Sequence, residues 1–357
     1  MAAVELDHVT GRSRTTTRLS EVTMSIGQGS VIGIVGGSGS GKTSLLRAVA
    51  GLDPVERGSI RFDGRDVTRA TPADREVAMV FQSPALIGHL SVRRNVSFPL
   101  DVRRLAVEEI RQRVDAEVRA LHIEALMGRD PSTLSVGEQQ MVQIARALVR
   151  VPQVLLLDEP FASLDELLRR RMRAEFAMLQ RGYGVTTLMT TNDCADIEAL
   201  AGFVAVLDDG RLVQVGETST VRRFPASMLA AVATGPLSLI DMTVVADQRG
   251  FWLQREDPAG GELVRLRSWG SGLAGHVGAK VTVGVRPEDV EISDNGSIPA
   301  TVERTAQFGT GGISCTVAGV RVTATAPSGQ RPSIGSAVRL RLHHHVVFDS
   351  VDDRTIG

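Results

Sequence analysis

The stretch Gly36-Gly37-Ser38-Gly39-Ser40-Gly41-Lys42-Thr43-Ser44 decides the fold. It follows the apolar run Val31–Val35 and precedes residues 45–50, Leu-Leu-Arg-Ala-Val-Ala, which favour a helix. Glycines in the pattern G-x-x-x-x-G-K-[ST] let successive backbone N–H groups turn toward the phosphates of a nucleotide, and the next helix presents its positive end. Lys42 is expected to reach the β- and γ-phosphates, and the hydroxyl of Thr43 to hold Mg²⁺. A buried strand before the stretch and a helix after it favour a phosphate-binding loop over a glycine-rich surface turn.

Length and composition exclude several other classes of protein. The chain has 357 residues, enough for two or three domains and a large core. It contains no apolar run of the ~18 residues that a membrane helix needs and no signal-peptide pattern, so we expect a cytoplasmic protein. Cys194 and Cys315 are too few and too far apart for a disulfide framework or a metal cluster. A net charge of −1 gives no excess of basic residues, so it does not support a nucleic-acid-binding protein. The run His343-His344-His345 stands without other metal ligands nearby, which disfavours a metal site.

Apolar periodicity outlines the elements around the loop. Residues 3–35 predict short strands, and residues 58–64 predict a hairpin strand closed by Asp-Gly. Apolar side chains recur at helical spacing from residue 107 to about residue 126, and a further helix is expected over residues 137–149. Buried strands of a parallel sheet are predicted at residues 77–81, 154–157, 185–189 and 203–207. Beyond residue 235, many short alternating segments predict a separate all-β domain.

A second pair of candidate residues stands at the end of one buried strand. The stretch Leu155-Leu156-Leu157-Asp158-Glu159-Pro160 places two carboxylates directly after apolar residues. Enzymes with a phosphate loop need one carboxylate to hold Mg²⁺ and another to orient or deprotonate the attacking water. An Asp-Glu pair alone is common on protein surfaces, but this context favours Asp158 as the metal residue and Glu159 as the catalytic residue.

Together these motifs resemble the nucleotide-binding subunits of ABC transporters over essentially the whole chain. The resemblance implies an α/β P-loop NTPase with a RecA-like core, a β-subdomain and a helical subdomain at about residues 91–150, all within residues 1–235. A small all-β, OB-like TOBE domain would follow at residues 236–357. Gln82, after Val80-Phe81, is similar to the glutamine that contacts Mg²⁺ and senses the membrane subunits. Ser163-Leu164-Asp165 is similar to the D-loop, which makes Asp165 a candidate nucleotide-binding residue.

The resemblance also implies partners. Leu134-Ser135-Val136-Gly137-Glu138-Gln139-Gln140 lies where the family has its LSGGQ signature, so Ser135, Gly137 and Glu138 would face the γ-phosphate of ATP held by a second nucleotide-binding subunit. The two subunits would meet head to tail beneath two transmembrane permease subunits, at the cytoplasmic face of the membrane. An extracytoplasmic solute-binding protein would take part indirectly.

The sequence departs from the pattern of the family in four ways. Val136 and Glu138 replace a glycine and a glutamine of the signature, which should weaken the clamp on phosphate. Asn192, in Thr191-Asn192-Asp193, replaces the switch histidine and cannot carry its charge, so we expect it to lower turnover more than binding. Ser13 stands where the family stacks adenine on an aromatic ring, and Gln140-Met141 where an arginine often follows the glutamines.

The C-terminal domain points to a type of transporter. Val283-Gly284-Val285-Arg286-Pro287-Glu288 and the end Val347-Phe348-Asp349 are similar to the domain appended to ATPases of binding-protein-dependent importers. Together with Phe98-Pro99-Leu100 they resemble carbohydrate importers of the maltose and glycerol-phosphate type, although polyamine, sulfate and iron importers share this architecture. Two alternatives to a working ATPase stay open: an attenuated regulatory subunit paired with a more active chain, and a soluble ABC protein of repair or translation, which the C-terminal domain disfavours.

Overall fold

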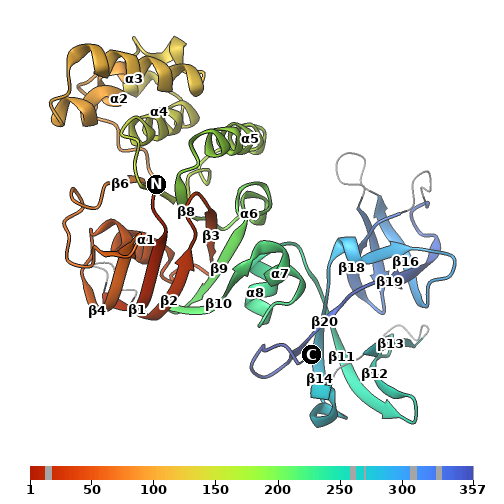
Figure 1. Ribbon diagram of the computed structural model, residues 1–357. Coiled ribbons are helices and arrows are strands. Elements are labelled where there is room, and N and C mark those ends of the chain that lie inside the picture. The colour runs from red at the N-terminus through yellow and green to blue at the C-terminus, as the bar shows by residue number, and fades with distance from the viewer. Residues whose placement is uncertain (13–17, 258–262, 269–270, 306–311, 327–331, 357) are drawn as a thin grey trace. The chain divides into compact units, whose positions relative to one another are not determined.

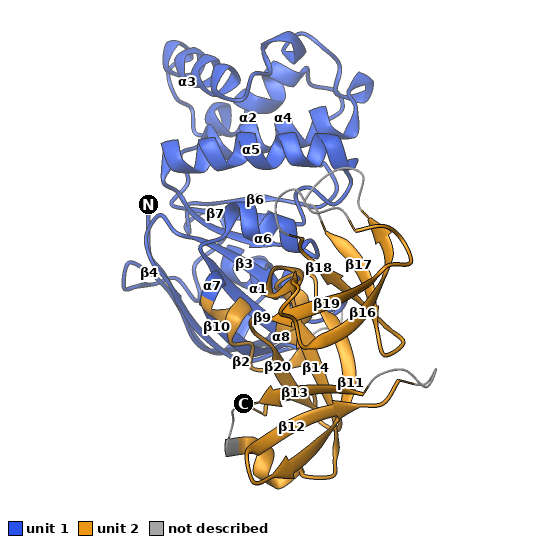
Figure 2. Ribbon diagram, turned by 90° about the vertical axis from the view of Figure 1, so that its right-hand side faces the viewer, with its two compact units in different colours: residues 1–219 blue, residues 220–357 orange. Residues whose placement is uncertain are grey.

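The computed structural model describes residues 1–12, 18–257, 263–268, 271–305, 312–326 and 332–356. The chain forms two compact units, residues 1–219 and residues 220–357, coloured separately in Figure 2. This division comes earlier in the chain than residue 235, where the sequence pattern changes, so the short helices α7 (Thr218–Arg223) and α8 (Met228–Ala233) belong mainly to the second unit. No helix of the described residues is both long enough and apolar enough to cross a membrane.

Unit 1 is built on two sheets (Figure 1). The larger has the strand order β10-β9-β3-β8-β7-β6 and is parallel except for its edge strand β10. Its strands are β3 (Val31–Val35), β6 (Val77–Val80), β7 (Val154–Asp158), β8 (Thr186–Thr190), β9 (Phe203–Asp208) and β10 (Arg211–Glu217). The smaller sheet is antiparallel, with the order β2-β1-β4-β5. Its strands are β1 (Val4–Arg12), β2 (Arg18–Ile26), β4 (Val55–Phe62) and β5 (Arg65–Asp66). The predicted hairpin at residues 58–64 is therefore present, as are the predicted parallel strands.

The helices of unit 1 fall into two groups. The helix α1 (Lys42–Ala50) follows the phosphate loop, while α5 (Glu166–Tyr183) and α6 (Cys194–Leu200) connect strands of the large sheet. A separate helical region contains α2 (Val92–Val102), α3 (Val107–Ala120) and α4 (Val136–Leu148). Two short 3-10 helices, Glu124–Leu126 and Pro131–Thr133, lie between α3 and α4. The amphipathic segment predicted to run to about residue 126 is thus one helix that ends at Ala120, followed by a 3-10 turn at Glu124–Leu126.

The strand β7 shows why the large sheet needs cover on both faces. All five of its residues are buried. Val154 and Leu156 belong to the core that contains α1 and the antiparallel sheet, whereas Leu155 and Leu157 belong to the core formed with α4 and α5. Because successive side chains of a strand point to opposite faces, this unbroken apolar run serves two cores at once. The strand is thereby fixed from both sides, and so is the residue at its end, Asp158.

Unit 2 is almost entirely β-structure, as the sequence predicts. One five-stranded sheet has the order β13-β12-β11-β14-β20 and the other β15-β19-β16-β17-β18, both antiparallel in the pairings described. The strands are β11 (Ser238–Asp247), β12 (Gly250–Arg255), β13 (Val264–Ser268), β14 (Lys280–Val285), β15 (Val290–Ile292), β16 (Ile298–Thr305), β17 (Ile313–Val317), β18 (Val320–Ala324), β19 (Ala337–Leu342) and β20 (Val346–Asp349). Side chains from both sheets, such as Val283 and Val302, share one apolar core.

A buried arginine closes the far end of α1. Arg75 is 3% exposed, and its guanidinium donates to the carbonyl oxygens of Ala48 (2.7 Å) and Val49 (2.8 Å) in the last turn of that helix. It also donates to the carbonyls of Thr68 (3.0 Å) and Ala70 (3.1 Å). Burial lowers the pKa of Arg75. The last carbonyls of a helix lack partners within the helix and carry partial negative charge, so this cation compensates for its own burial by satisfying them.

Replacement of Arg75 by alanine should therefore destabilise unit 1. We expect Arg75→Ala to lower the free energy of unfolding by about 2–3 kcal/mol, because buried carbonyls lose charged donors. Chemical denaturation followed by the helical circular-dichroism signal would measure this change. Arg57→Ala, which removes an exposed arginine from β4, is the matched control and should change stability by less than about 0.5 kcal/mol. Equal denaturation midpoints for the two variants would contradict the capping role.

Candidate functional site

The predicted site residues come from the carboxyl ends of four neighbouring strands. The phosphate loop follows β3, Gln82 follows β6, Asp158 ends β7, and Asn192 lies just after β8. These strands run parallel within one sheet, so their ends meet at one edge (Figure 1). Loops at this edge of an open parallel sheet are the usual place for a ligand in such folds. The topology thus gathers residues that lie far apart in the sequence.

The phosphate loop is shaped by glycines that cannot be replaced without strain. Gly36, Gly39 and Gly41 have φ angles of 153°, 80° and 103°, a region that other residues rarely adopt. A Cβ at Gly36 would also lie 2.1 Å from the carbonyl oxygen of Leu207, whereas one at Gly37 or Gly39 would meet nothing within 4 Å. The loop is therefore packed against β9 on one side and open on the other.

The remaining loop residues divide between these two sides. Gly37, Ser38 and Gly39 are exposed, whereas Ser40 and Ser44 are buried. The carbonyl oxygen of Ser40 accepts from the backbone N–H of Gly210 (2.9 Å), which ties the loop to the turn after β9. The exposed backbone at Gly37–Gly39 is thus the part that a ligand can approach.

Lys42 folds back over its own loop. Its Nζ donates to the carbonyl oxygens of Gly36 (2.9 Å) and Gly37 (3.0 Å). The side chain is buried, and this burial lowers the pKa of Lys42, while the nearby charges of Glu159 and Asp158 act in the opposite direction. A desolvated ammonium group held beside two carboxylates and an open loop is suited to a polyanion that can replace its carbonyl partners.

Asp158 links the phosphate loop to the neighbouring strand. Its Oδ1 accepts one hydrogen bond from the hydroxyl of Thr43 (2.9 Å) and another from the hydroxyl of Thr190 (2.8 Å). The Thr190 hydroxyl in turn accepts from the backbone N–H of Glu159 (2.9 Å). Thr190 ends β8 and is fully buried. One hydroxyl therefore orients the carboxylate of Asp158 and the backbone of Glu159 together.

Glu159 is the point where the predicted catalytic residues meet. Its Oε2 accepts from Nε2 of Gln82 (3.1 Å) and its Oε1 from Nδ2 of Asn192 (2.6 Å). Glu159 has a φ of 43°, in the left-handed region, which costs a residue other than glycine about 1–2 kcal/mol. Asp193, beside Asn192, caps α6 and pairs with Arg169 (3.1 Å), which fixes the loop that carries the amide. The side-chain amides of two residues that follow different strands thus hold the carboxylate of Glu159 in place.

The signature segment forms a helix start of its own. Ser135 is the N-cap of α4, and its hydroxyl accepts from the backbone N–H of Glu138 (3.3 Å). The Glu138 carboxylate accepts from the backbone N–H of Ser135 (2.7 Å) and pairs with Arg129 (3.2 Å). These contacts, the backbone hydrogen bond first, lower the pKa of Glu138. The negative charge expected to disturb the clamp is therefore matched by a cation and by the helix start.

Two further signature positions differ in how they are buried. Gly137 is buried, and a Cβ there would lie 2.4 Å from Cδ2 of Leu168, so a glycine allows α4 to pack closely against α5. Val136, which replaces a glycine of the family pattern, is 47% exposed. Its branched side chain therefore lies at the surface, in the first turn of α4, and does not disturb the core.

Other predicted residues make their hydrogen bonds elsewhere than in the network around Asp158. Asp165 is the N-cap of α5, where its carboxylate accepts from the backbone N–H of Leu168 (3.0 Å). Ser135, Gly137 and Glu138 lie at the start of α4. Ser13, the expected adenine position, lies outside the described residues. Sequence reasoning missed Thr190 and Arg129; the only signal for Thr190 was a hydroxyl residue that directly follows a buried strand pattern.

Comparisons with known proteins agree with this geometry. Residues 19–162 match the ABC transporter family, and residues 283–348 match the TOBE domain. The sn-glycerol-3-phosphate import ATP-binding protein UgpC of Salmonella typhi is 36% identical over 351 residues, which cover 97% of this chain and 96% of that protein. The chain belongs to the ATP-binding subunits of ABC importers. This ABC ATPase is therefore an enzyme that binds and hydrolyses ATP, and its C-terminal unit contains a TOBE domain.

Relatives of the ABC ATPase differ in what their names say they import. The Fe(3+) ions import ATP-binding protein FbpC 1 of Pectobacterium atrosepticum is 35% identical over 308 residues, with 86% of this chain and 84% of that protein covered. The spermidine/putrescine import ATP-binding protein PotA of Pseudomonas aeruginosa is 36% identical over 300 residues, with 82% and 79% covered. The sequence identities to import proteins for iron, polyamines and glycerol phosphate are similar, so they leave the solute of this chain undetermined.

Two solved structures share the ATPase fold. CbiO1 of Clostridium perfringens, part of the ABC transporter complex CbiONQ, matches with a TM-score of 0.56 and 29% identity over 62% of this chain and 95% of that one. An ATP-binding cassette solved as a dimer in a post-hydrolysis state with ADP and phosphate matches with a TM-score of 0.54 and 27% identity, over 60% and 98%. The expected fold class, an ABC ATPase core followed by a β-domain, is thus confirmed.

The shared hydroxyl of Thr190 leads to a kinetic prediction. Thr190→Val keeps the shape of the side chain but removes the donor to Asp158 and the acceptor for Glu159, so we expect kcat for ATP hydrolysis to fall by about 10–100-fold. The Kd for ATP measured without Mg²⁺ should change much less, because the phosphate loop is untouched. Thr187→Val is the matched control, since Thr187 is a buried threonine of the same strand that bonds to Gln180 and Val185. Equal kcat values for both variants would contradict a positioning role for Thr190.

Proposed function

We propose that the ABC ATPase powers a binding-protein-dependent importer by closing on ATP together with a second nucleotide-binding subunit. The observation that carries this proposal is the continuous network from Thr43 through Asp158 and Thr190 to Glu159, with Gln82 and Asn192 on its carboxylate. Each residue type that phosphoryl transfer needs is present at one edge of the sheet. Glu159 is the group that would orient or deprotonate the attacking water.

The same residues fit Mg²⁺. Thr43 and Asp158 bring a hydroxyl and a carboxylate to 2.9 Å from each other beside the open side of the loop. Oxygen donors of this kind are the ligands Mg²⁺ takes from a protein when it is bound mainly through substrate phosphates. We assign Thr43, Asp158 and Gln82 to the metal, either directly or through its water shell. When bound, the ion would neutralise charge on the phosphates during transfer.

Binding of ATP should rearrange two local contacts. The ammonium group of Lys42 would exchange the carbonyls of Gly36 and Gly37 for the β- and γ-phosphates, which offer it a full counter-charge. Across the dimer, Ser135 and the backbone at Gly137 would meet the γ-phosphate held by the other subunit, since the Ser135 hydroxyl can still donate its proton while it accepts from Glu138. Asp165, at the start of α5, would lie near this contact.

The remaining assignments follow from the family. We propose that residues 1–235 act as the nucleotide-binding domain, with a helical subdomain at about residues 91–150, and residues 236–357 as the regulatory TOBE domain. The ATPase would associate peripherally with the inner face of the membrane through two permease subunits, and a solute-binding protein would deliver the solute from outside. A carbohydrate or its phosphate is our proposed solute, because the glycerol-phosphate relative covers 97% of this chain.

Steady-state ATP hydrolysis by the complex purified through this chain tests the proposal. Lys42→Ala and Glu159→Gln should each abolish turnover, and only Lys42→Ala should also weaken ATP binding strongly, because Glu159 acts on water rather than on the nucleotide. Permease subunits should co-purify with both variants. Turnover that survives in both would mean that another chain carries hydrolysis.

An attenuated regulatory subunit is the second candidate, and Asn192 is the observation that favours it. The amide of Asn192 stays neutral, whereas a histidine could donate a charged hydrogen bond to the γ-phosphate and relay a proton. A hydrogen bond to a charged group stabilises by about 1 kcal/mol more than a neutral one, and this difference in the activation free energy corresponds to about fivefold in rate.

We therefore expect Asn192→His to raise kcat by about fivefold with little change in the KM for ATP. Asn192→Ala should lower kcat, because Glu159 loses one of its two amide donors. Measurement of both variants in the assembled complex separates the candidates. Unchanged kcat in Asn192→His, together with a loss in Asn192→Ala, would show that the amide suffices and that the natural site is a full motor.

A further inference from the structure

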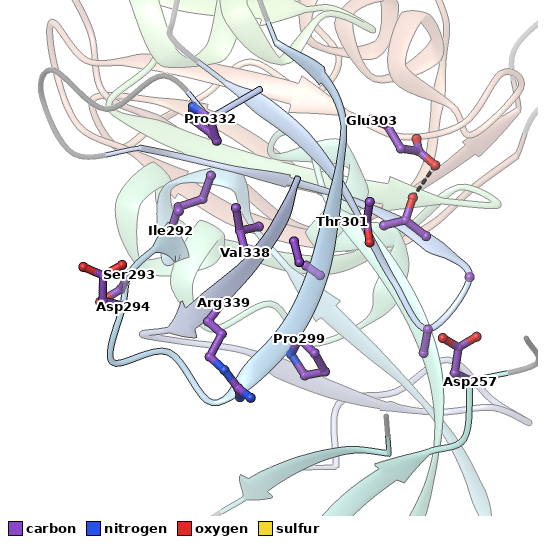
Figure 3. Close-up of a pocket in the computed structure, with 15 residues that line it drawn as sticks. Asp257, Ile292, Ser293, Asp294, Pro299, Thr301, Glu303, Pro332, Val338 and Arg339 are labelled. Atoms are coloured by element: carbon purple, nitrogen blue, oxygen red, sulfur yellow. Dashed lines mark hydrogen bonds between the residues drawn. The ribbon is translucent and has the colours of Figure 1, made fainter. Parts of the chain in front are cut away.

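The C-terminal unit contains two cavities of different character. The one in Figure 3 has a volume of about 1100 Å³ and is lined by the edges of β15, β16 and β19. Asp257, Asp294 and Glu303 lie on separate sides of it, with Arg339 as the one basic residue among its described lining. Scattered charges of mixed sign do not indicate a particular ligand.

The second cavity, which we call the arginine cavity, has a volume of about 870 Å³ and a concentrated positive charge. Its lining includes Arg223, Arg265, Arg267, Arg341 and the run His343–His345. No described residue of this lining is acidic. Its size lies within the range of about 300–1,000 Å³ that is usual for small-molecule sites. A concave site of this charge is suited to a compact anion.

Regular secondary structure places these arginines on one surface. Val264, Leu266 and Ser268 of β13 are buried, so the alternation of the strand leaves Arg265 and Arg267 on its other face. Arg223 ends α7, and Arg341 stands in β19. The cations therefore come from three elements that lie far apart in the sequence. Positive charges converge here through the fold and not through a local run of basic residues.

Aromatic rings orient two of the arginines. The guanidinium of Arg265 lies 4.8 Å from the ring centre of Trp252, and that of Arg223 lies 5.7 Å from the ring centre of Phe224. Stacking on a ring holds a guanidinium in place while its N–H groups remain able to donate in the plane. These side chains are partly ordered before any ligand arrives, which reduces the entropy lost on binding.

Nearby carboxylates only partly offset this charge. Asp247 lies 3.5 Å from Nη2 of Arg265, and Glu291 lies 3.1 Å from Nε2 of His343. Burial and the neighbouring His344 lower the pKa of His345 to about 4, so His345 is neutral at physiological pH and offers hydrogen bonds without charge. Asp289 is a third carboxylate near the cavity: burial raises its pKa, and the neighbouring charges of His344 and Arg223 act in the opposite direction. The positive charge is that of the four arginines, which exceed these three carboxylates by one.

We propose that the arginine cavity binds a small molecule that carries phosphate groups. A guanidinium matches a phosphate with two parallel hydrogen bonds, and four such groups around one cavity favour a polyanion over a neutral sugar. The concave shape favours a small ligand over the flat surface of a protein. The cavity lies wholly within residues 223–355, and the tryptophans of the chain lie in the same unit.

Tryptophan fluorescence provides the test, because both tryptophans, Trp252 and Trp269, belong to the C-terminal unit and none to the ATPase unit. The full chain is titrated with pyrophosphate, without Mg²⁺, at ionic strength held constant with KCl. We expect a saturable change with a Kd below about 1 mM. Arg341→Ser and Arg223→Ser should each raise this Kd about tenfold, because each removes a charged donor.

Two controls separate this cavity from other sites. Arg304→Ser removes an equal charge from β16 outside the cavity and should leave the Kd unchanged. Lys42→Ala disables the phosphate loop, so a fluorescence change that persists in it with the same Kd comes from the C-terminal unit. Isothermal titration calorimetry on the same variants checks the Kd without fluorescence. A linear response, a response lost in Lys42→Ala, or a Kd that Arg341→Ser and Arg223→Ser leave unchanged would overturn the proposal.

Discussion

One carboxylate oxygen, Oδ1 of Asp158, connects the two halves of the ATPase site. It accepts one hydrogen bond from the hydroxyl of Thr43 in the phosphate loop and another from the hydroxyl of Thr190 in the neighbouring strand. Asp158 can hold this position because the rest of β7 is buried between two apolar cores. The hydrophobic packing of the strand therefore determines how precisely the polar site is positioned, since an oxygen that accepts two hydrogen bonds tolerates little displacement.

The electrostatics of the site follow from the same burial. Lys42 loses hydration at the start of α1, and the carboxylates of Asp158 and Glu159 offset part of that cost. Asn192 and Gln82 give Glu159 two neutral donors instead of a cation. Neutral donors orient this carboxylate, which we propose acts on the attacking water. At the signature, by contrast, Glu138 has its own cation, Arg129.

Much of the fold was predictable because its key segments obey strong local rules. The glycine-rich phosphate loop, whose glycines have positive φ, and the fully apolar run before Asp158 are each compatible with few other local structures. The helix α2 was not predicted as a separate element, and it carries Pro99 in its interior, where a proline normally ends a helix. The one sequence signal for Thr190 was too weak to predict its role, since a threonine at a strand end is commonplace and only the folded sheet brings its hydroxyl to Asp158.

The glycine at position 33 illustrates how tightly the ATPase core is fitted. A Cβ there would lie 2.0 Å from Cδ1 of Ile197 in α6, the helix that begins just after Asn192. A larger residue in the middle of β3 would press on Ile197, and so on the helix that follows Asn192. A change at a position without any chemical group of its own can thus alter the geometry around Asn192 through packing alone.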